Sequence, residues 1–365
     1  MKHIFNKILA GGAVLLTTVA CTGNYLDINS NQSQPGDLTP DGFALVSSMT
    51  NICSTVAPSD VNCTQFVDCL LGGTLGGYFS DGANFTSSYV RNNAPNNWTE
   101  VFLKDKKIIS TLFTNLSMVE GFCETSGDLV PMAVANIIKI AAMHRVTDCY
   151  GPIPYSAIGF EGAIKTPYDS QEDVYNKFFE ELAAARQILL DNPTAVMSPL
   201  VDKVYGGDIS NWVRFANSLQ LRLALRISYA NKELAQAKAE DAIDPKNGGV
   251  IETNDQNATW KNYQTSTNSM RTAIMYNAHD TRPSAEIACY LNGYKDPRIS
   301  KYLTESGSPE SPGLNGKPYK NDDGTWMTAP DGTSLQYVGI RRGWETFSTS
   351  TSPMSTFPAP RRLFG

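Results

Sequence analysis

The chain has 365 residues and a formal net charge of -6 at pH 7, an acidic balance that argues against a nucleic-acid partner. Hydrophobic residues make up 41% of the chain and charged residues only 18%, so we expect a globular protein with a sizeable core and a neutral, polar surface. Such a surface suits uncharged, polyhydroxylated ligands.

The first twenty residues have the composition of a cleaved export signal. A basic start precedes the uncharged stretch Ile8–Ala20, which is shorter than the about 20 apolar residues needed to span a bilayer. The sequence TVAC at 18–21, at the end of this stretch, resembles the lipobox of bacterial lipoproteins, although leucine is the usual residue at the position of Thr18. This resemblance implies cleavage before Cys21 and lipid attachment, including palmitate-type chains, to that residue. The alternative is an ordinary signal peptide with a structural cysteine nearby.

The segment after the signal is polar, and the remaining cysteines form no recognisable motif. Residues 21–40 are rich in Asn, Ser, Gln and Pro, which predicts a flexible, lipid-anchored tether. The six later cysteines allow fifteen disulfide pairings. They include no C-x-x-C pair, and only His144 and His279 remain after the signal, so we expect no zinc site. No motif indicates a cofactor, and none is expected. Most are expected to be small buried hydrophobes, with one bridge among Cys53, Cys63 and Cys69 as the alternative.

From about residue 42 helical patterns dominate. The spacing of apolar residues predicts a helix from Trp98 to about Glu120, with Trp98 packed in the core. A strongly apolar helix is expected from Asp128 to Val146, with Asp128 as its N-cap. His144 lies on this helix, and we expect it to be a satisfied core histidine.

Three further helices follow. Ser170 begins a capping box before a helix that ends at Asn192-Pro193. Asp208 or Ser210 caps the next helix, which runs to about residue 230 and is apolar nearly all round, so it is expected to be buried with Trp212 in the core. Its arginines, Arg222 and Arg226, are then expected to form structural ion pairs. The last helix runs from Asn231 to about Ala242.

The chain changes character after about residue 244. Residues 245–365 are rich in Gly, Pro, Asn, Thr and Tyr, and only Pro283–Asn292 has a helical pattern there. The NDDGT sequence at 321–325 lacks the acid spacing of a calcium loop, so a hairpin turn is expected. The helices that precede this region come in pairs, as in helical-hairpin arrays.

Five short sequences in one order carry a resemblance to a known family. They are YLDIN (25–29), VTDCYGPIPYSAI (146–158), TPYDSQEDVYNKFFEELAAA (166–185), NWVRFANSLQLRLALRIS (211–228) and KDPRISKYL (295–303). With these five motifs in this order, the chain is similar to the SusD/RagB family of Bacteroidetes outer-membrane lipoproteins. The similarity covers nearly the whole of the chain after the signal.

This resemblance implies a fold, a location and partners. The expected fold is mainly α, a tetratricopeptide-like helix-pair body, the SusD-like α superhelix, with a large loop-rich region. Residues 41–365 would form one such domain, with the helical body to about 244 and the ligand and partner region at 245–365. Family members continue beyond the PAPRRLFG ending with further helices, so C-terminal helices are expected to be missing. The expected partners are an oligosaccharide or other nutrient, a SusC-type TonB-dependent transporter and the outer membrane.

Glycan recognition needs exposed aromatic faces and planar polar groups. The expected contacts in the loop-rich region are Trp326, Trp344, Trp260, Tyr263 and Arg341, and two weaker candidates, Tyr78 and Arg91, flank a Gly-, Ser- and Asn-rich stretch. Plain packing is the alternative for these aromatic residues.

We therefore expect a surface lipoprotein that captures a nutrient glycan and delivers it to a transporter, without catalysis. The His279-Asp280 pair has no nucleophile motif beside it, and the acidic pairs are expected to be solvated or turn residues. Two alternatives are a binder of peptide or protein nutrients and a carbohydrate-active enzyme.

Overall fold

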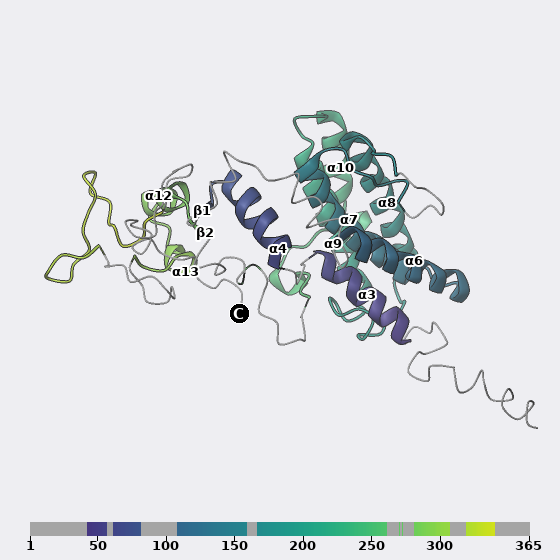
Figure 1. Cartoon of the computed structure of the whole chain (residues 1–365). Helices are drawn as coiled ribbons and strands as arrows, with labels where there is room; N and C mark the ends of the chain where they lie inside the picture. Colours follow the sequence, from purple (N-terminus) through teal and green to yellow (C-terminus); the bar gives the residue numbers. More distant parts are fainter. Residues whose placement is uncertain are drawn as a thin grey trace, which may run out of the picture.

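The fold is seen in a computed structural model, which describes residues 42–56, 61–81, 108–158, 166–260, 270, 272, 281–306 and 319–339. Its largest part is a body of paired helices (Figure 1). The helices are α3 (Phe43–Val56), α6 (Ile108–Ser126), α7 (Val130–Tyr150), α8 (Gln171–Asp191), α9 (Ile209–Arg226) and α10 (Lys232–Ile243). Neighbours in sequence pack against one another from α6 to α10, and α3 packs on α6 and α7. The predicted mainly helical, helix-pair architecture is confirmed.

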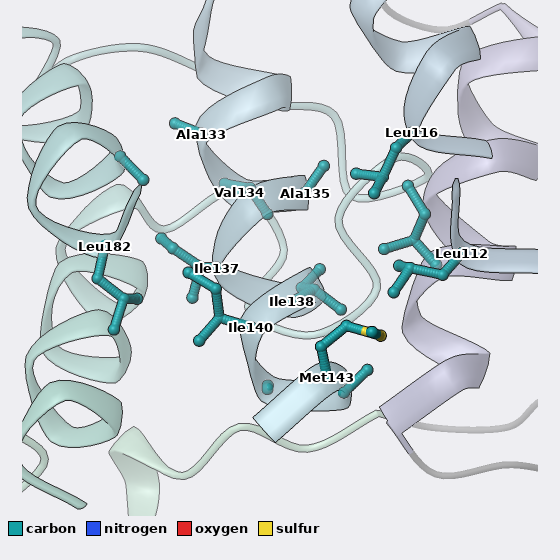
Figure 2. Close-up of a cluster of buried hydrophobic side chains, with 14 of the residues drawn as sticks. Leu112, Leu116, Ala133, Val134, Ala135, Ile137, Ile138, Ile140, Met143 and Leu182 are labelled. Carbon is teal, nitrogen blue, oxygen red and sulfur yellow. The ribbon is translucent and has the colours of Figure 1, made fainter. Parts of the chain in front are cut away.

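Helix α7 is the centre of the body. Its sequence is apolar on every side, and α3, α6, α8 and α9 all contact it. Figure 2 shows Leu112 and Leu116 of α6 on one side of α7 and Leu182 of α8 on the other. A helix that is surrounded in this way buries nearly every side chain, and this explains why its hydrophobic pattern has no polar face.

Side-chain caps fix the beginnings of α8, α9 and α10, and the sequence predicts the first two of them. Ser170 Oγ accepts a hydrogen bond from the Asp173 amide at 3.1 Å and donates to its carboxylate at 2.7 Å, which confirms the cap of α8. Asp208, not Ser210, caps α9 by accepting from the Asn211 amide at 3.1 Å. Asn231 caps α10 in the same way, through the Leu234 amide at 3.0 Å. The predicted N-cap of α7 is wrong by one residue: Leu129 is the N-cap and its side chain makes no cap bond, although the Asp128 carboxylate before it accepts from the Val130 amide at 2.9 Å.

The predicted burial of α9 is wrong in its last turns. Leu225 is 63% exposed and Arg222 is exposed, because α8 and α10 cover only one side of the helix. The predicted ion pair of Arg226 is confirmed, since its Nη2 lies 2.6 Å from Asp148 Oδ2. Within the described residues, no such pair is found for Arg222. Trp212 is buried as predicted, and Trp98 lies outside the described residues.

Two of the quoted sequence motifs meet at one carboxylate. Ile153 and Asp169 exchange backbone hydrogen bonds of 3.2 and 2.9 Å. The Asp169 side chain accepts from the amides of Tyr155 and Ser156 at 3.1 and 2.7 Å. The loop after α7 is thereby fixed to the residues that lead into α8. Asp169 therefore couples the motif at 146–158 to the motif at 166–185.

A second part of the molecule combines segments that are far apart in the chain. A helix that begins with α4 (Val61–Cys63) and continues as the π-helical η1 (Thr64–Gly73) runs from the body toward β1 (Phe79–Asp81), as Figure 1 shows. Strand β1 pairs antiparallel with β2 (Thr281–Pro283). Strand β2 leads directly into α12 (Ala285–Gly293), which is followed by α13 (Ile299–Tyr302). We call β1, β2, residues 284–306 and residues 319–339 the α12 region.

The last described segment is a pair of tight turns attached to α12. The expected hairpin at NDDGT is confirmed, because Asn321 and Thr325 share a 2.8 Å backbone hydrogen bond and Lys320 pairs with Trp326. The segment is held by Asn292, whose side-chain amide donates to the Tyr337 carbonyl at 2.9 Å. Ser306 adds a 2.8 Å backbone bond to Gln336. Residues 319–339 are thus anchored on the α12 region.

Residues 245–260 remain packed on the helical body, although they follow the expected division near residue 244. They include the short 3₁₀ helices η3 (Pro245–Asn247) and η4 (Asn254–Gln256). The Asn217 amide donates to the carbonyls of Asn247 and Gly249 at 2.7 and 2.8 Å. The division of residues 41–365 into a body and a loop-rich region stays a prediction.

The cysteines behave mainly as small apolar residues. Cys53, Cys63, Cys69 and Cys123 are buried, and no disulfide is formed among the cysteines of the described residues, so the alternative of a bridge is wrong. Nor does that part of the chain contain a cluster of three side chains able to hold a metal ion. Among the helices described, none is both long and apolar enough to cross a bilayer.

Two glycines give a first test of the packing. Gly207 has a φ of 94°, and a Cβ atom there would lie 2.1 Å from the Met197 carbonyl oxygen. We expect Gly207→Ala to lower the free energy of unfolding by more than about 2 kcal/mol. Gly121 lies inside α6, and a Cβ atom there would have no atom within 4 Å apart from its chain neighbours and the backbone of the same helix. Gly121→Ala should therefore raise the free energy of unfolding by about 0.5–1 kcal/mol. Urea midpoints of the two variants check this prediction, and equal effects would contradict it.

Candidate functional site

The structure describes three of the predicted ligand-contacting residues, Trp260, Trp326 and Tyr78. The other predicted residues, Cys21, Trp344, Tyr263, Arg341 and Arg91, lie outside the described residues. The dyad His279-Asp280 lies outside them as well. The candidate site is therefore built from the aromatic side chains of the α12 region and of the body.

Trp260 belongs to the helical body. It is half-buried and packs against the main hydrophobic core. Its buried Nε1 atom has no hydrogen-bond partner among the described residues. Trp260 therefore packs on the helical body, and its contact with a ligand stays a prediction.

Trp326 lies on the hairpin of the α12 region and is half-exposed. The Lys320 ammonium stands over its ring, 4.4 Å from the ring centroid. A cation on the face of an indole is attracted by the negative potential of the ring. One face of Trp326 is therefore covered by Lys320, and a ligand would meet the other face or displace the lysine.

Tyr78 directly precedes β1 and is 58% exposed. Its carbonyl oxygen accepts a 3.1 Å hydrogen bond from the amide of Ser284, the N-cap residue of α12. The hydroxyl of Ser284 also donates to the Gly77 carbonyl. These bonds tie the chain at Tyr78 to the beginning of α12, so residues about 200 positions apart in sequence meet at one place.

Two tyrosines that the sequence analysis missed form an exposed aromatic pair in the α12 region. Tyr290 and Tyr294 are 64% and 80% exposed. Their rings are parallel within 4°, with centroids 6.2 Å apart. The spacing of four residues places both on one face of the helical turn. Ala288 and Leu291 of the same helix are buried in a small apolar cluster, whereas both tyrosine side chains are exposed to solvent.

The signal for this pair was present in the sequence. The letters ACYLNGYKD at 288–296 contain Y-x-x-x-Y at the end of a predicted helix. The pattern by itself does not tell which face of the helix is buried. The packing of Leu291 against Leu303, which follows α13, decides that question.

Helix α12 ends in an unusual way, directly beside this pair. The Lys295 amide donates to the Asn292 carbonyl at 3.0 Å, and the Asp296 amide donates to the Leu291 carbonyl at 2.9 Å. These are the two bonds of a Schellman cap, in which Lys295 occupies the left-handed position with a φ of 50°. Glycine is usual there, because a Cβ atom costs about 1 kcal/mol in this conformation. Within the described residues, Lys295 alone among non-glycine residues has a positive φ.

The carboxylate next to Lys295 is engaged elsewhere. Asp296 accepts hydrogen bonds from Arg298 Nε at 2.9 Å and Nη2 at 2.6 Å. These hydrogen bonds lower the pKa of Asp296 to about 2. Lys295 itself is exposed and has no ion pair among the described residues. The end of α12 thus presents two tyrosine rings and one exposed positive charge.

The buried ionisable groups of the body have structural roles. His144 Nδ1 lies 3.1 Å from the Ile140 carbonyl oxygen, and burial lowers the pKa of His144, as expected of a core histidine. Lys139 Nζ lies 2.8 Å from Glu181, which also accepts a hydrogen bond from the Tyr155 hydroxyl. These groups join α7, α8 and the loop between them.

The molecule is a body of packed helix pairs together with a region that carries an exposed pair of tyrosines. The chain matches the family described as SusD-like, Susd and RagB outer membrane lipoprotein, over residues 27–351, and it belongs to that family. The predicted family is confirmed, and the description of that family agrees with the predicted outer-membrane location. No functionally curated protein matches the chain.

Several solved structures are similar to this chain. A SusD homolog from Bacteroides uniformis is 44% identical, with a TM-score of 0.73, and the match covers 87% of this chain and 61% of that one. A SusD homolog from Bacteroides thetaiotaomicron is 31% identical, with a TM-score of 0.68 and coverage of 87% and 59%. A chitin-binding SusD homolog from Flavobacterium johnsoniae is 27% identical, with a TM-score of 0.66 and coverage of 87% and 61%. The chain therefore spans about 60% of the length of these relatives.

Proposed function

We propose that this protein binds a nutrient glycan at the cell surface and delivers it to a SusC-type TonB-dependent transporter. The observation that carries the proposal is the exposed, parallel pair Tyr290 and Tyr294. Aromatic rings pack against the C–H face of a sugar ring, and two rings on one helix provide such contacts without any rearrangement of the backbone. The chitin-binding relative supports a carbohydrate as the ligand class.

Anchoring is the second part of the proposal. Lipid attached to Cys21 would hold the binding surface at the membrane, and residues 21–40 would act as the tether. A receptor held at the mouth of a transporter works at a high local glycan concentration, so modest affinity for each sugar suffices. Mass spectrometry of the native protein should find a diacylglyceryl group on Cys21, and an unmodified sulfhydryl would contradict the anchor.

Binding is tested with the full chain in detergent. We expect isothermal titration calorimetry to detect at least one member of a panel of neutral and acidic oligosaccharides. The same samples, assayed for new reducing ends, should show none, whereas released reducing ends would favour the alternative of a carbohydrate-active enzyme. If peptides bind and no glycan does, the alternative of a peptide-nutrient receptor is favoured. Co-purification of an outer-membrane barrel with the native lipoprotein tests the transporter.

A further inference from the structure

Lys295 is difficult to explain by stability alone. It occupies the left-handed position of the cap that ends α12, where glycine or asparagine causes less strain. A cation near a helix C-terminus interacts favourably with the helix dipole. A lysine in the last turn, at Asn292 or Gly293, would make that interaction with ordinary backbone angles. Residues held in strained backbone conformations are concentrated at binding and other functional sites.

The surroundings of Lys295 leave its charge available. The neighbouring carboxylate of Asp296 is occupied by Arg298, through bonds of 2.6 and 2.9 Å. No ion pair neutralises Lys295 within the described residues. Its neighbour in sequence is Tyr294, which is 80% exposed and parallel to Tyr290. A stacking surface and an exposed cation therefore lie at the same end of one helix.

We propose that Tyr290, Tyr294 and Lys295 form a subsite for a glycan that carries a carboxylate. A sugar ring would stack on a tyrosine, and the carboxylate of a uronic acid would accept a charge-assisted hydrogen bond from the lysine. The net charge of -6 disfavours dense polyanions, which would meet repulsion over the rest of the surface. The expected ligand is thus a largely neutral chain with isolated uronic acids. This inference rests on the proposed function and specifies its ligand.

Matched oligosaccharides test the ligand class. One pair is a xylo-oligosaccharide with and without a glucuronic acid branch, and the other is trigalacturonic acid methylated on two of its three carboxylates and the fully methylated ester. With the full chain in detergent at about 50 mM salt, calorimetry should show that at least one acidic member binds about three- to tenfold more tightly than its neutral partner. That preference should shrink in about 500 mM salt, because screening weakens an exposed charge pair.

Three variants separate the charge of Lys295 from its backbone role. Lys295→Arg keeps the charge and should keep the preference. Lys295→Asn tolerates the left-handed conformation without the charge, and it should bind the acidic and the neutral members equally. Lys295→Gly should also lose the preference while its Tm rises by about 1–3 °C, because the strain is relieved. A merely structural lysine would change the Tm without changing the preference.

The outcomes distinguish this inference from the function on which it rests. If neutral glycans bind and neither acidic member is preferred, or if Lys295→Asn keeps the preference, the carboxylate subsite is wrong while glycan binding stands. If heparin, a dense polyanion, binds more tightly than both isolated uronic acids, the inference is also overturned. If no glycan of either kind binds, the proposed function and the subsite both fail.

Discussion

Replacing Tyr290 and Tyr294 together with alanine should weaken glycan binding by about 30-fold or more. Each exposed ring offers a flat apolar face, and the removal of one stacking aromatic typically costs about 1–1.5 kcal/mol of binding free energy. Both rings lie on one helix with parallel planes, so the two losses are expected to add up on the same ligand. Calorimetric titration of the tightest ligand from the panel measures this effect.

A matched control exists on the helical body. Tyr229 follows α9 and is fully exposed, but it lies outside the α12 region. Tyr229→Ala should bind as the unaltered protein does. All variants should keep their helical circular dichroism. Tyr290 and Tyr294 are not part of the small apolar cluster around Leu291, so replacing them leaves that cluster intact. If the double variant binds normally, the tyrosine pair is not the glycan surface, and Trp326 becomes the residue to replace next.

Removing the carboxylate of Asp202 should produce the largest loss of stability. This side chain is 2% exposed and accepts four hydrogen bonds, from the amides of Val204, Tyr205 and Gly207 and from Trp212 Nε1, at 2.8–3.0 Å. Asp202→Ala leaves four donors without their acceptor, of which the Trp212 indole is buried and the three amides are partly buried. We expect the free energy of unfolding to fall by about 3–5 kcal/mol, measured from urea midpoints.

Two further variants make the Asp202 prediction specific. Asp202→Asn keeps the shape and one acceptor oxygen, so it should lose about half as much stability as the alanine variant. Asp322→Ala changes an exposed carboxylate of the hairpin and should stay within about 0.5 kcal/mol of the unaltered protein. If Asp202→Ala leaves the free energy of unfolding unchanged, the prediction is wrong, and water replaces the carboxylate without loss of stability.

The sequence determined the helical body in detail. The cap Ser170, the cap Asp208 as one of two candidates, and the apolar stretch of α7 were readable because they are local: each cap and the amide it binds lie three residues apart. The five ordered motifs also indicated the family, which the match over residues 27–351 confirms. Even the hairpin at 321–325 followed from its turn residues.

Predictions that depended on burial were less successful. The apolar residues of α9 lie nearly all round the helix, which indicated that neighbouring helices cover it on all sides. Leu225 is nevertheless exposed, because the neighbouring helices pack on one side only. Periodicity states which residues share a face, but it does not state how many faces a neighbouring helix covers. The burial of Trp260 also depends on tertiary structure. Its ring is half-buried because residues 245–260 pack on the helical body.

The candidate site was decided by tertiary structure. The strand pairing of β1 with β2 joins residues 79–81 to residues 281–283, and no local pattern indicates a contact over that separation. This pairing and the bonds from Ser284 fix α12, and the burial of Leu291 turns Tyr290 and Tyr294 outward. The sequence by itself determined the helices, their ends and the family, because those depend on neighbours within a few residues. Which aromatic rings face solvent depends on contacts between distant segments, so only the folded chain decides it.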